Sequence, residues 1–134
     1  MTAVMRPRTV PSAEVFLAES VMDVLAETAD RAYAENLVHS GVLLGTFYQD
    51  SRGIYASVTG ARPGDDPDGA VGRYRAEPGS GCAPAESDLS AQQQLFGTGK
   101  SYLMVLTGAD SAFIVIKAEG GSLQPVRFVI SEGC

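Results

Sequence analysis

The chain is poor in the residues on which much enzyme chemistry depends. Its 134 residues include no tryptophan, one histidine and two cysteines. The single histidine, His39, leaves no paired imidazole for a zinc centre, and the cysteines show no CxxC spacing. Because Cys82 and Cys134 lie far apart in a chain that is 45% apolar, we expect two thiols in a cytoplasmic protein rather than a disulfide framework.

Long apolar runs and a positive net charge are also missing. No stretch approaches the ~18 apolar residues that cross a bilayer, and residues 1–14, with two arginines and two prolines, do not resemble a signal peptide. A net charge of −6 disfavours non-specific binding to nucleic acid. The sequence therefore predicts an acidic cytoplasmic protein that binds neither membrane nor nucleic acid. Eight arginines against two lysines, with abundant Ala, Gly and Asp, suggest a GC-rich bacterial genome.

The apolar pattern predicts one domain that begins with a helix. Residues 1–13 carry two prolines and are expected to be a flexible lead-in to a domain that spans residues 14–134. Apolar side chains then recur at three- and four-residue steps, which predicts a helix that begins near residues 13–15 and ends at residue 35 or 36. Ser12 is a candidate cap for this helix.

The rest of the chain reads mainly as strands. The β-compatible runs are residues 41–48, 54–59, 71–76, 101–106, 112–117 and 123–130. The first two flank a turn and predict a hairpin, whereas residues 61–70 have the composition of a loop. Ser87 is expected to cap a second helix over residues 88–96. This mixture predicts an α+β fold, with helices packed on a largely antiparallel sheet.

Three blocks of sequence resemble the JAMM/MPN (Mov34/JAB) domain family. Residues 37–45 are similar to the family's first strand, residues 53–61 to its second strand, and residues 71–96 to its zinc-binding segment and following helix. The family segment runs roughly V-G-W-Y-H-S-H-P-G-x-G-x-x-x-S-x-x-D. Its frame is kept here in Val71-Gly72, Tyr74, Pro78-Gly79, Gly81 and Asp88. The resemblance implies an MPN/JAB-like fold.

The catalytic side chains of that family are exchanged in this chain. Family members use a glutamate as base, two histidines and an aspartate to hold zinc, and a serine that assists catalysis. The corresponding positions are Val38, Arg75, Glu77, Asp88 and Ala85. Only Asp88 keeps its chemistry, and a guanidinium, which stays protonated and has no free lone pair, cannot ligate a cation. The resemblance thus implies a degenerate member with no metal, no cofactor and no zinc-peptidase activity.

Two arrangements are open for the vacated site. Arg75 and Glu77 are two residues apart on a predicted strand and therefore face the same side. Arg75 either replaces the metal and pairs with Glu77 and Asp88, or points to solvent beside an eroded pocket. Cys82, in the loop beside the site, has no histidine near it in sequence and is expected to be inert. His39 is expected to be structural.

The function implied is a non-catalytic interaction domain, either a scaffold or a peptide-binding module. Its degenerate pocket comprises Val38, Arg75, Glu77, Cys82, Ala85 and Asp88. The implied partner is a second copy, another MPN domain, or a ubiquitin-like or sulfur-carrier tail whose carboxylate Arg75 would bind. The alternative function is a hydrolase with a rebuilt active site that uses Glu77, Asp88 and Cys82.

Overall fold

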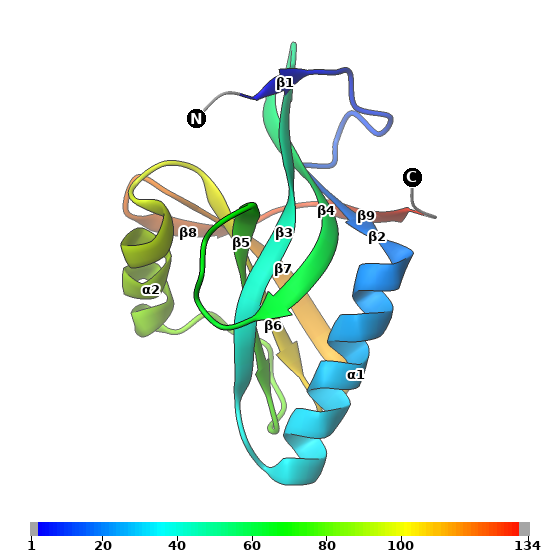
Figure 1. Cartoon of the computed structure of the whole chain (residues 1–134), viewed down its shortest axis with the longest axis vertical. Helices are drawn as coiled ribbons and strands as arrows, with labels where there is room; N and C mark the ends of the chain where they lie inside the picture. Colours follow the sequence, from blue (N-terminus) through cyan, green and yellow to red (C-terminus); the bar gives the residue numbers. More distant parts are fainter. Residues whose placement is uncertain (1–2, 132–134) are drawn as a thin grey trace.

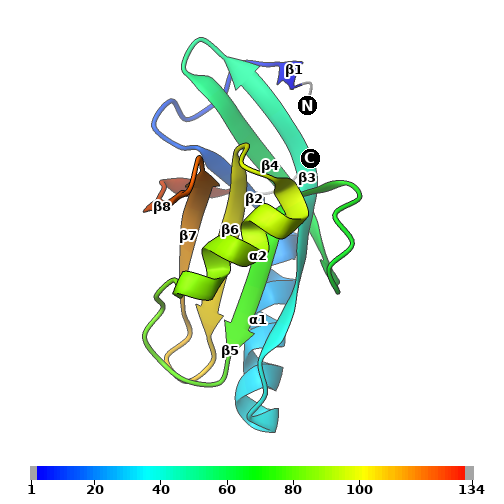
Figure 2. The ribbon, with the colours of Figure 1, turned by 90° about the vertical axis from the view of Figure 1, so that its left-hand side faces the viewer.

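A computed structural model describes residues 3–131 as one curled, mixed β-sheet with a helix on each face (Figure 1, Figure 2). The strands are β1 (Val4–Met5), β2 (Val15–Ala18), β3 (His39–Asp50), β4 (Gly53–Pro63), β5 (Ala70–Glu77), β6 (Ser101–Thr107), β7 (Ala112–Glu119), β8 (Ser122–Pro125) and β9 (Phe128–Ser131). The helices are α1 (Glu19–Glu35) and α2 (Glu86–Phe96). The strand order is β8-β7-β6-β5-β3-β4-β2-β9, and β1 pairs with β3.

The predicted α+β class is supported, although the sheet dominates and is more mixed than expected. Strands β3 and β4 form the predicted antiparallel hairpin, with a register shift between Leu44 and Gly45. Among the described residues, four of the eight strand pairings run parallel: β1–β3, β2–β4, β2–β9 and β5–β6. The expectation of a largely antiparallel sheet therefore holds for only half of the pairings: β3–β4, β3–β5, β6–β7 and β7–β8.

The first helix begins later than its apolar pattern predicts. Residues 15–18 form β2, which runs between β4 and β9 with Val15 and Leu17 fully buried. Helix α1 starts only at Glu19, after Ala18, so Ser12 is not its cap. Leu17 fits both the three-to-four-residue spacing of a helix and the alternation of a strand, and the sequence alone could not separate the two. The predicted end of the helix, at residue 35, is confirmed.

Residues 123–130, which we predict to be one strand, form parts of two strands, β8 and β9. These two strands lie at opposite edges of the sheet. Strand β8 pairs with β7, and β9 pairs in parallel with β2. Only residues 126 and 127 connect them, because the sheet curls and brings its two ends close together. The change of partner is marked by the Val126 amide, which donates to the carbonyl of Val115 on β7. A continuous apolar run could not reveal this change.

The main core lies between α1 and the sheet. It includes Leu25 from α1, Leu43 from β3 and Tyr102 from β6. A smaller cluster of Leu103, Val105 and Ile116 lies apart from this core. Neither helix in residues 3–131 is long and apolar enough to cross a membrane.

The segment before β2, which we expected to be a flexible lead-in, contacts the sheet from residue 3 on. Strand β1 runs parallel to the end of β3, with Val4 opposite Tyr48. The Arg8 side chain, 7% exposed, pairs with Asp50 at 2.8 Å. Residues 3–13 therefore lie beside the projecting end of the β3–β4 hairpin (Figure 1).

Candidate functional site

Strand β5 presents a charged face to α2. Arg73, Arg75 and Glu77 alternate with the buried residues Tyr74 and Ala76, which belong to the main core on the other face. Helix α2 crosses the charged face (Figure 2). It begins at Glu86, two residues earlier than predicted, and Ala85 rather than Ser87 precedes its first turn.

Of the two arrangements that the sequence leaves open, the structure has the one in which Arg75 pairs with both carboxylates. Its Nε lies 3.1 Å from Asp88 Oδ1 and its Nη2 2.8 Å from Asp88 Oδ2, which is a bidentate pair. Nη1 donates to Glu77 Oε1, and Nη2 also lies 3.3 Å from the carbonyl of Ala83. Arg75 therefore does not point to solvent, and its side chain is only 13% exposed.

The Asp88 carboxylate is fixed from a second side by the start of α2. Its Oδ2 accepts a 2.6 Å hydrogen bond from the Ala85 amide, and the Asp88 amide donates to the Ala85 carbonyl at 2.9 Å. A carboxylate in the first turn satisfies an amide that has no helical partner and lies at the positive end of the helix dipole. Ala85 contributes only backbone atoms, and Asp88, 3% exposed, joins the helix cap to Arg75.

A second arginine, Arg73, lies on the same face of β5. Burial lowers the pKa of Arg73, the nearby Asp88 carboxylate raises it, and Arg75 lowers it further. Arg73 Nη1 is buried and has no hydrogen-bond partner among the described residues. Burial also lowers the pKa of Arg75, but the hydrogen bonds and charges of Asp88 and Glu77 outweigh that effect and raise it overall. Two guanidinium groups therefore face two carboxylates.

Helix α2 has another polar anchor further along. Gln92 is fully buried, and its Nε2 donates to Ser101 Oγ at 2.9 Å and to the Tyr102 carbonyl at 3.0 Å. Its Oε1 is buried without a partner among the described residues. Asp88 and Gln92 are the buried residues of this helix, and both are polar.

Cys82 and Thr107 contact each other next to Glu77, at the end of the β5–β6 pairing. Thr107 is opposite Glu77 in the β5–β6 register, and Cys82 Sγ lies 3.2 Å from Thr107 Oγ1. The Thr107 hydroxyl donates to Asp110, whose other oxygen accepts from the Gly81 amide at 3.1 Å. These two hydrogen bonds hold the pKa of Asp110 below its ordinary value. Because Thr107 gives its proton to Asp110, the thiol is left as the donor, which is not the arrangement of an activated nucleophile.

Val38 lies at the open rim of the site. His39 is opposite Ala76 and Ser40 is opposite Arg75, so continuing the register by one residue places Val38 opposite Glu77. Val38 is 56% exposed. His39, on the other face, contacts Glu35 Oε1 at 2.9 Å through its Nε2, in keeping with a structural role.

An exposed apolar surface adjoins this rim. Tyr33, Leu37 and Val38 are 59%, 58% and 56% exposed. Gly108 joins the surface to the site, because its amide donates to the Glu77 carbonyl at 2.8 Å. A β-carbon at Gly108 would lie 2.6 Å from Tyr33 Cβ.

Comparison with solved structures identifies the fold. Protein DSY2949 from Desulfitobacterium hafniense matches with a TM-score of 0.63 and 12% identity over 88% of this chain and 93% of that one. AF2198 from Archaeoglobus fulgidus, a JAB1/MPN domain protein, matches with a TM-score of 0.56 and 16% identity over 84% and 97%. This chain has an MPN-like fold. At these identities the MPN-like fold alone is shared. No protein-family model and no curated protein matches the sequence.

Proposed function

We propose that this protein is a non-catalytic MPN-like interaction domain in which the Arg75 guanidinium takes the place of a metal ion. The observation that supports the proposal is the bidentate pair with Asp88, completed by Glu77. Both carboxylates neutralise an internal cation and are not free to ligate an external one. With Arg73 beside them, the four charges sum to zero, whereas a zinc site needs neutral or anionic donors.

The chain also lacks the general base and the serine that the family's peptidase mechanism uses. The residue at the position of the general base is Val38, which cannot accept a proton from a bound water. Ala85 offers no hydroxyl in place of the serine. A hydrolase rebuilt on Glu77, Asp88 and Cys82 would first have to free both carboxylates from Arg75.

The interaction surface proposed is formed by Tyr33, Leu37 and Val38. Exposed apolar side chains gathered beside a site are typical of protein contacts. Arg75 is less suited to a partner's carboxylate than we expected, since its Nε, Nη1 and Nη2 all donate within the cluster. A second copy or another MPN-like domain fits this surface better than a tail bound through Arg75.

Light scattering at rising protein concentration, with affinity capture of partners, tests the proposal. Leu37→Glu should abolish self-association or capture of the partner. Val24→Glu is the matched control, because Val24 is 50% exposed on α1 and lies about 16 Å along the helix from its end at Glu35, which Leu37 follows. A protein that stays monomeric and captures nothing sensitive to Leu37→Glu would contradict the interaction function. Zinc retained at one ion per chain, or turnover lost on Glu77→Gln, would contradict its non-catalytic character.

A further inference from the structure

A cleft of about 330 Å³ lies between the N-terminal segment and the sheet, remote from the Arg75 site. Residues 6–9 form one wall, and β2, β3, β4 and the end of β9 supply the rest. Tyr48 lines it, eight residues along β3 from Ser40, the residue opposite Arg75. At about 3.3 Å per residue, that separation is roughly 26 Å.

The lining of the cleft is rich in hydrogen-bond donors and lacks carboxylates among the described residues. Acidic residues outnumber basic ones by 16 to 10 in the chain, yet no Asp or Glu is among the described residues that line the cleft. The polar side chains there are two arginines, two tyrosines and the hydroxyls of Thr9, Ser57, Thr59 and Ser131. All of them can donate, which is the complement of an anion.

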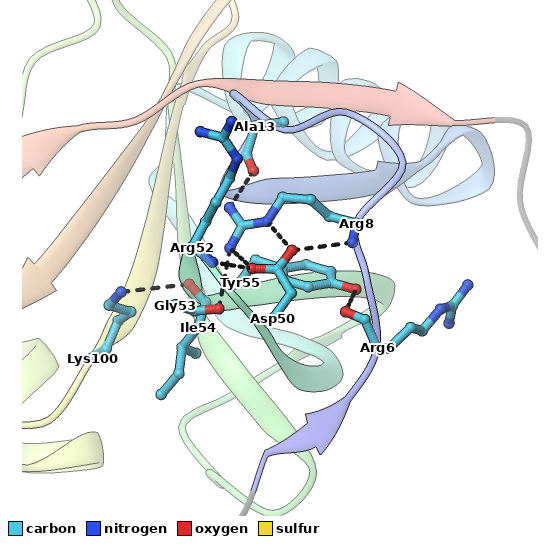
Figure 3. Close-up of polar contacts among 9 residues, drawn as sticks. All are labelled: Arg6, Arg8, Ala13, Asp50, Arg52, Gly53, Ile54, Tyr55 and Lys100. Carbon is cyan, nitrogen blue, oxygen red and sulfur yellow. Dashed lines mark hydrogen bonds and ion pairs between the residues drawn. The ribbon is translucent and has the colours of Figure 1, made fainter.

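The two arginines of the Arg6-Pro7-Arg8 motif have different roles. Arg8 is occupied: Nε and Nη2 donate to the Asp50 carboxylate at 2.8 and 2.9 Å, and its other bonds go to the carbonyls of Ala13 and Gly53 (Figure 3). These contacts raise the pKa of Arg8, mainly through Asp50. Arg8 therefore shapes the cleft, but its positive charge is already neutralised by Asp50.

Arg6 has a guanidinium that no carboxylate in residues 3–131 pairs with. Its backbone is fixed, because Tyr55 Oη donates to the Arg6 carbonyl at 2.7 Å. Its side chain points away from Asp50 (Figure 3) and lies 4.9 Å from the centre of the Tyr48 ring. A positive charge is thus held beside the cleft without an internal counter-ion.

Aromatic rings form a second wall of the cleft, next to the Arg6 and Arg8 guanidinium groups that lie over Tyr48 and Tyr55. The rings of Tyr48 and Tyr55 stack with centroids 5.5 Å apart, and Phe16 meets Tyr55 edge-on at 5.5 Å. Such a wall adds affinity for a ring or short acyl group by burying its surface. A volume near 330 Å³ lies at the lower end of the range for small-molecule sites.

We propose that this cleft binds a small organic anion of the aromatic or short-chain carboxylate class. Its charge pairs with Arg6 and the hydroxyls, and its apolar body lies against Tyr48 and Tyr55. The proposal is independent of the interaction function, because the two sites share no residues.

Amide NMR titration of the full chain with benzoate tests the proposal, with benzamide as the neutral analogue. Benzoate should shift the amides of Phe16, Tyr48 and Ser57 in a saturable manner. Benzamide should bind at least about tenfold more weakly, since it lacks the charge that Arg6 pairs with. Inorganic phosphate, an anion without a ring, should bind more weakly than benzoate and shift mainly residues near Arg6.

Two matched variants distinguish binding in the cleft from a general attraction of benzoate to arginine side chains. Arg6→Gln should weaken benzoate at least about tenfold without unfolding the protein, because only its backbone holds Tyr55. Arg52→Gln removes an arginine that does not line this cleft and should leave benzoate binding unchanged. Equal binding of benzoate and benzamide, shifts outside the cleft, or unchanged affinity in Arg6→Gln would overturn the proposal. Phosphate as tight as benzoate would overturn the role of the aromatic wall.

Discussion

Arg75 and Asp88, thirteen residues apart in the chain, meet through two parallel hydrogen bonds of 3.1 and 2.8 Å. Because Asp88 also accepts the Ala85 amide, the pair connects strand β5 to the first turn of α2. One buried cation therefore determines both the charge balance of the site and the position of the helix that covers it.

Removing that cation should destabilise the protein more than removing an exposed one. Arg75→Met leaves Asp88 buried and unpaired, and we expect a loss of roughly 2–4 kcal/mol in the free energy of unfolding measured with urea. The upper part of the range for broken buried pairs is not expected, because Asp88 keeps the Ala85 amide and Glu77 is a third exposed. Lys117→Met, which breaks a 3.9 Å pair with the half-exposed Glu119, should cost at most about 1 kcal/mol.

A double-mutant cycle isolates the interaction itself. Asp88→Asn removes the charge that Arg75 neutralises while keeping an oxygen for the Ala85 amide. Arg75→Met combined with Asp88→Asn should lose less than the sum of the two single variants. If the two losses of unfolding free energy simply add, the interaction between Arg75 and Asp88 does not contribute to stability.

Exchanging the cation for imidazoles should restore a metal site if the guanidinium stands in for zinc. The variant Arg75→His/Glu77→His, with Asp88 unchanged, should bind about one zinc per chain, measured by calorimetry and metal analysis. The wild type should bind none tightly. Adding Asp88→Asn should abolish uptake, and uptake that survives this change would place the metal elsewhere.

The ion pair between Arg8 and Asp50 should make stability depend on pH. The hydrogen bond from Arg8 holds the pKa of Asp50 well below its ordinary value. A carboxyl with a depressed folded-state pKa stabilises the protein above its unfolded-state pKa, near 4, and loses that contribution as the pH falls further. The wild type should therefore lose more stability between pH 5 and pH 3 than Asp50→Asn, in urea unfolding at each pH. Asp66→Asn, at an exposed pair, should behave like the wild type.

Gly72 lies opposite Tyr102, where the backbones of β5 and β6 pass close to each other. A β-carbon there would lie 2.1 Å from the Tyr102 carbonyl oxygen, a backbone atom that cannot swing away. Gly72→Ala should cost about 2 kcal/mol or more in unfolding free energy, as overpacking does. Gly99→Ala, where nothing lies within 4 Å, should have little effect. Equal stability of the two variants would show that the strands adjust freely.

Local patterns predicted β3, β5, β6 and β7 to within two residues at both ends, but they missed β1 and β2 and merged β8 with β9. The family resemblance offered the Arg75 cluster as one of two arrangements. The spacing of Arg75 and Glu77 specifies a shared strand face, so their proximity needed only the correct strand assignment. Asp88 was placed near them by the resemblance, and the structure agrees. The candidate site is thus largely recoverable from residues 71–88.

What the sequence could not predict depends on contacts between distant segments. The parallel pairings of β2 with β4 and β9 join residues 15–18 to two strands far along the chain, and no local signal specifies them. The burial of Arg73 and Gln92 follows from how α2 sits on the sheet. The cleft beside Arg6 arises because residues 3–13 fold back on β3, whereas proline content suggested a loose segment.

The polar underside of α2 has a consequence for how the molecule opens. Helix α1 is held by apolar side chains such as Leu25, which tolerate small displacements, whereas α2 depends on Asp88 and Gln92, whose bonds fail once their geometry is lost. In native-state hydrogen exchange at low urea, the amides of α2 should therefore exchange through a partial opening, well before those of α1. The side of the molecule that carries the Arg75 cluster would then unfold locally and refold while the remainder stays folded.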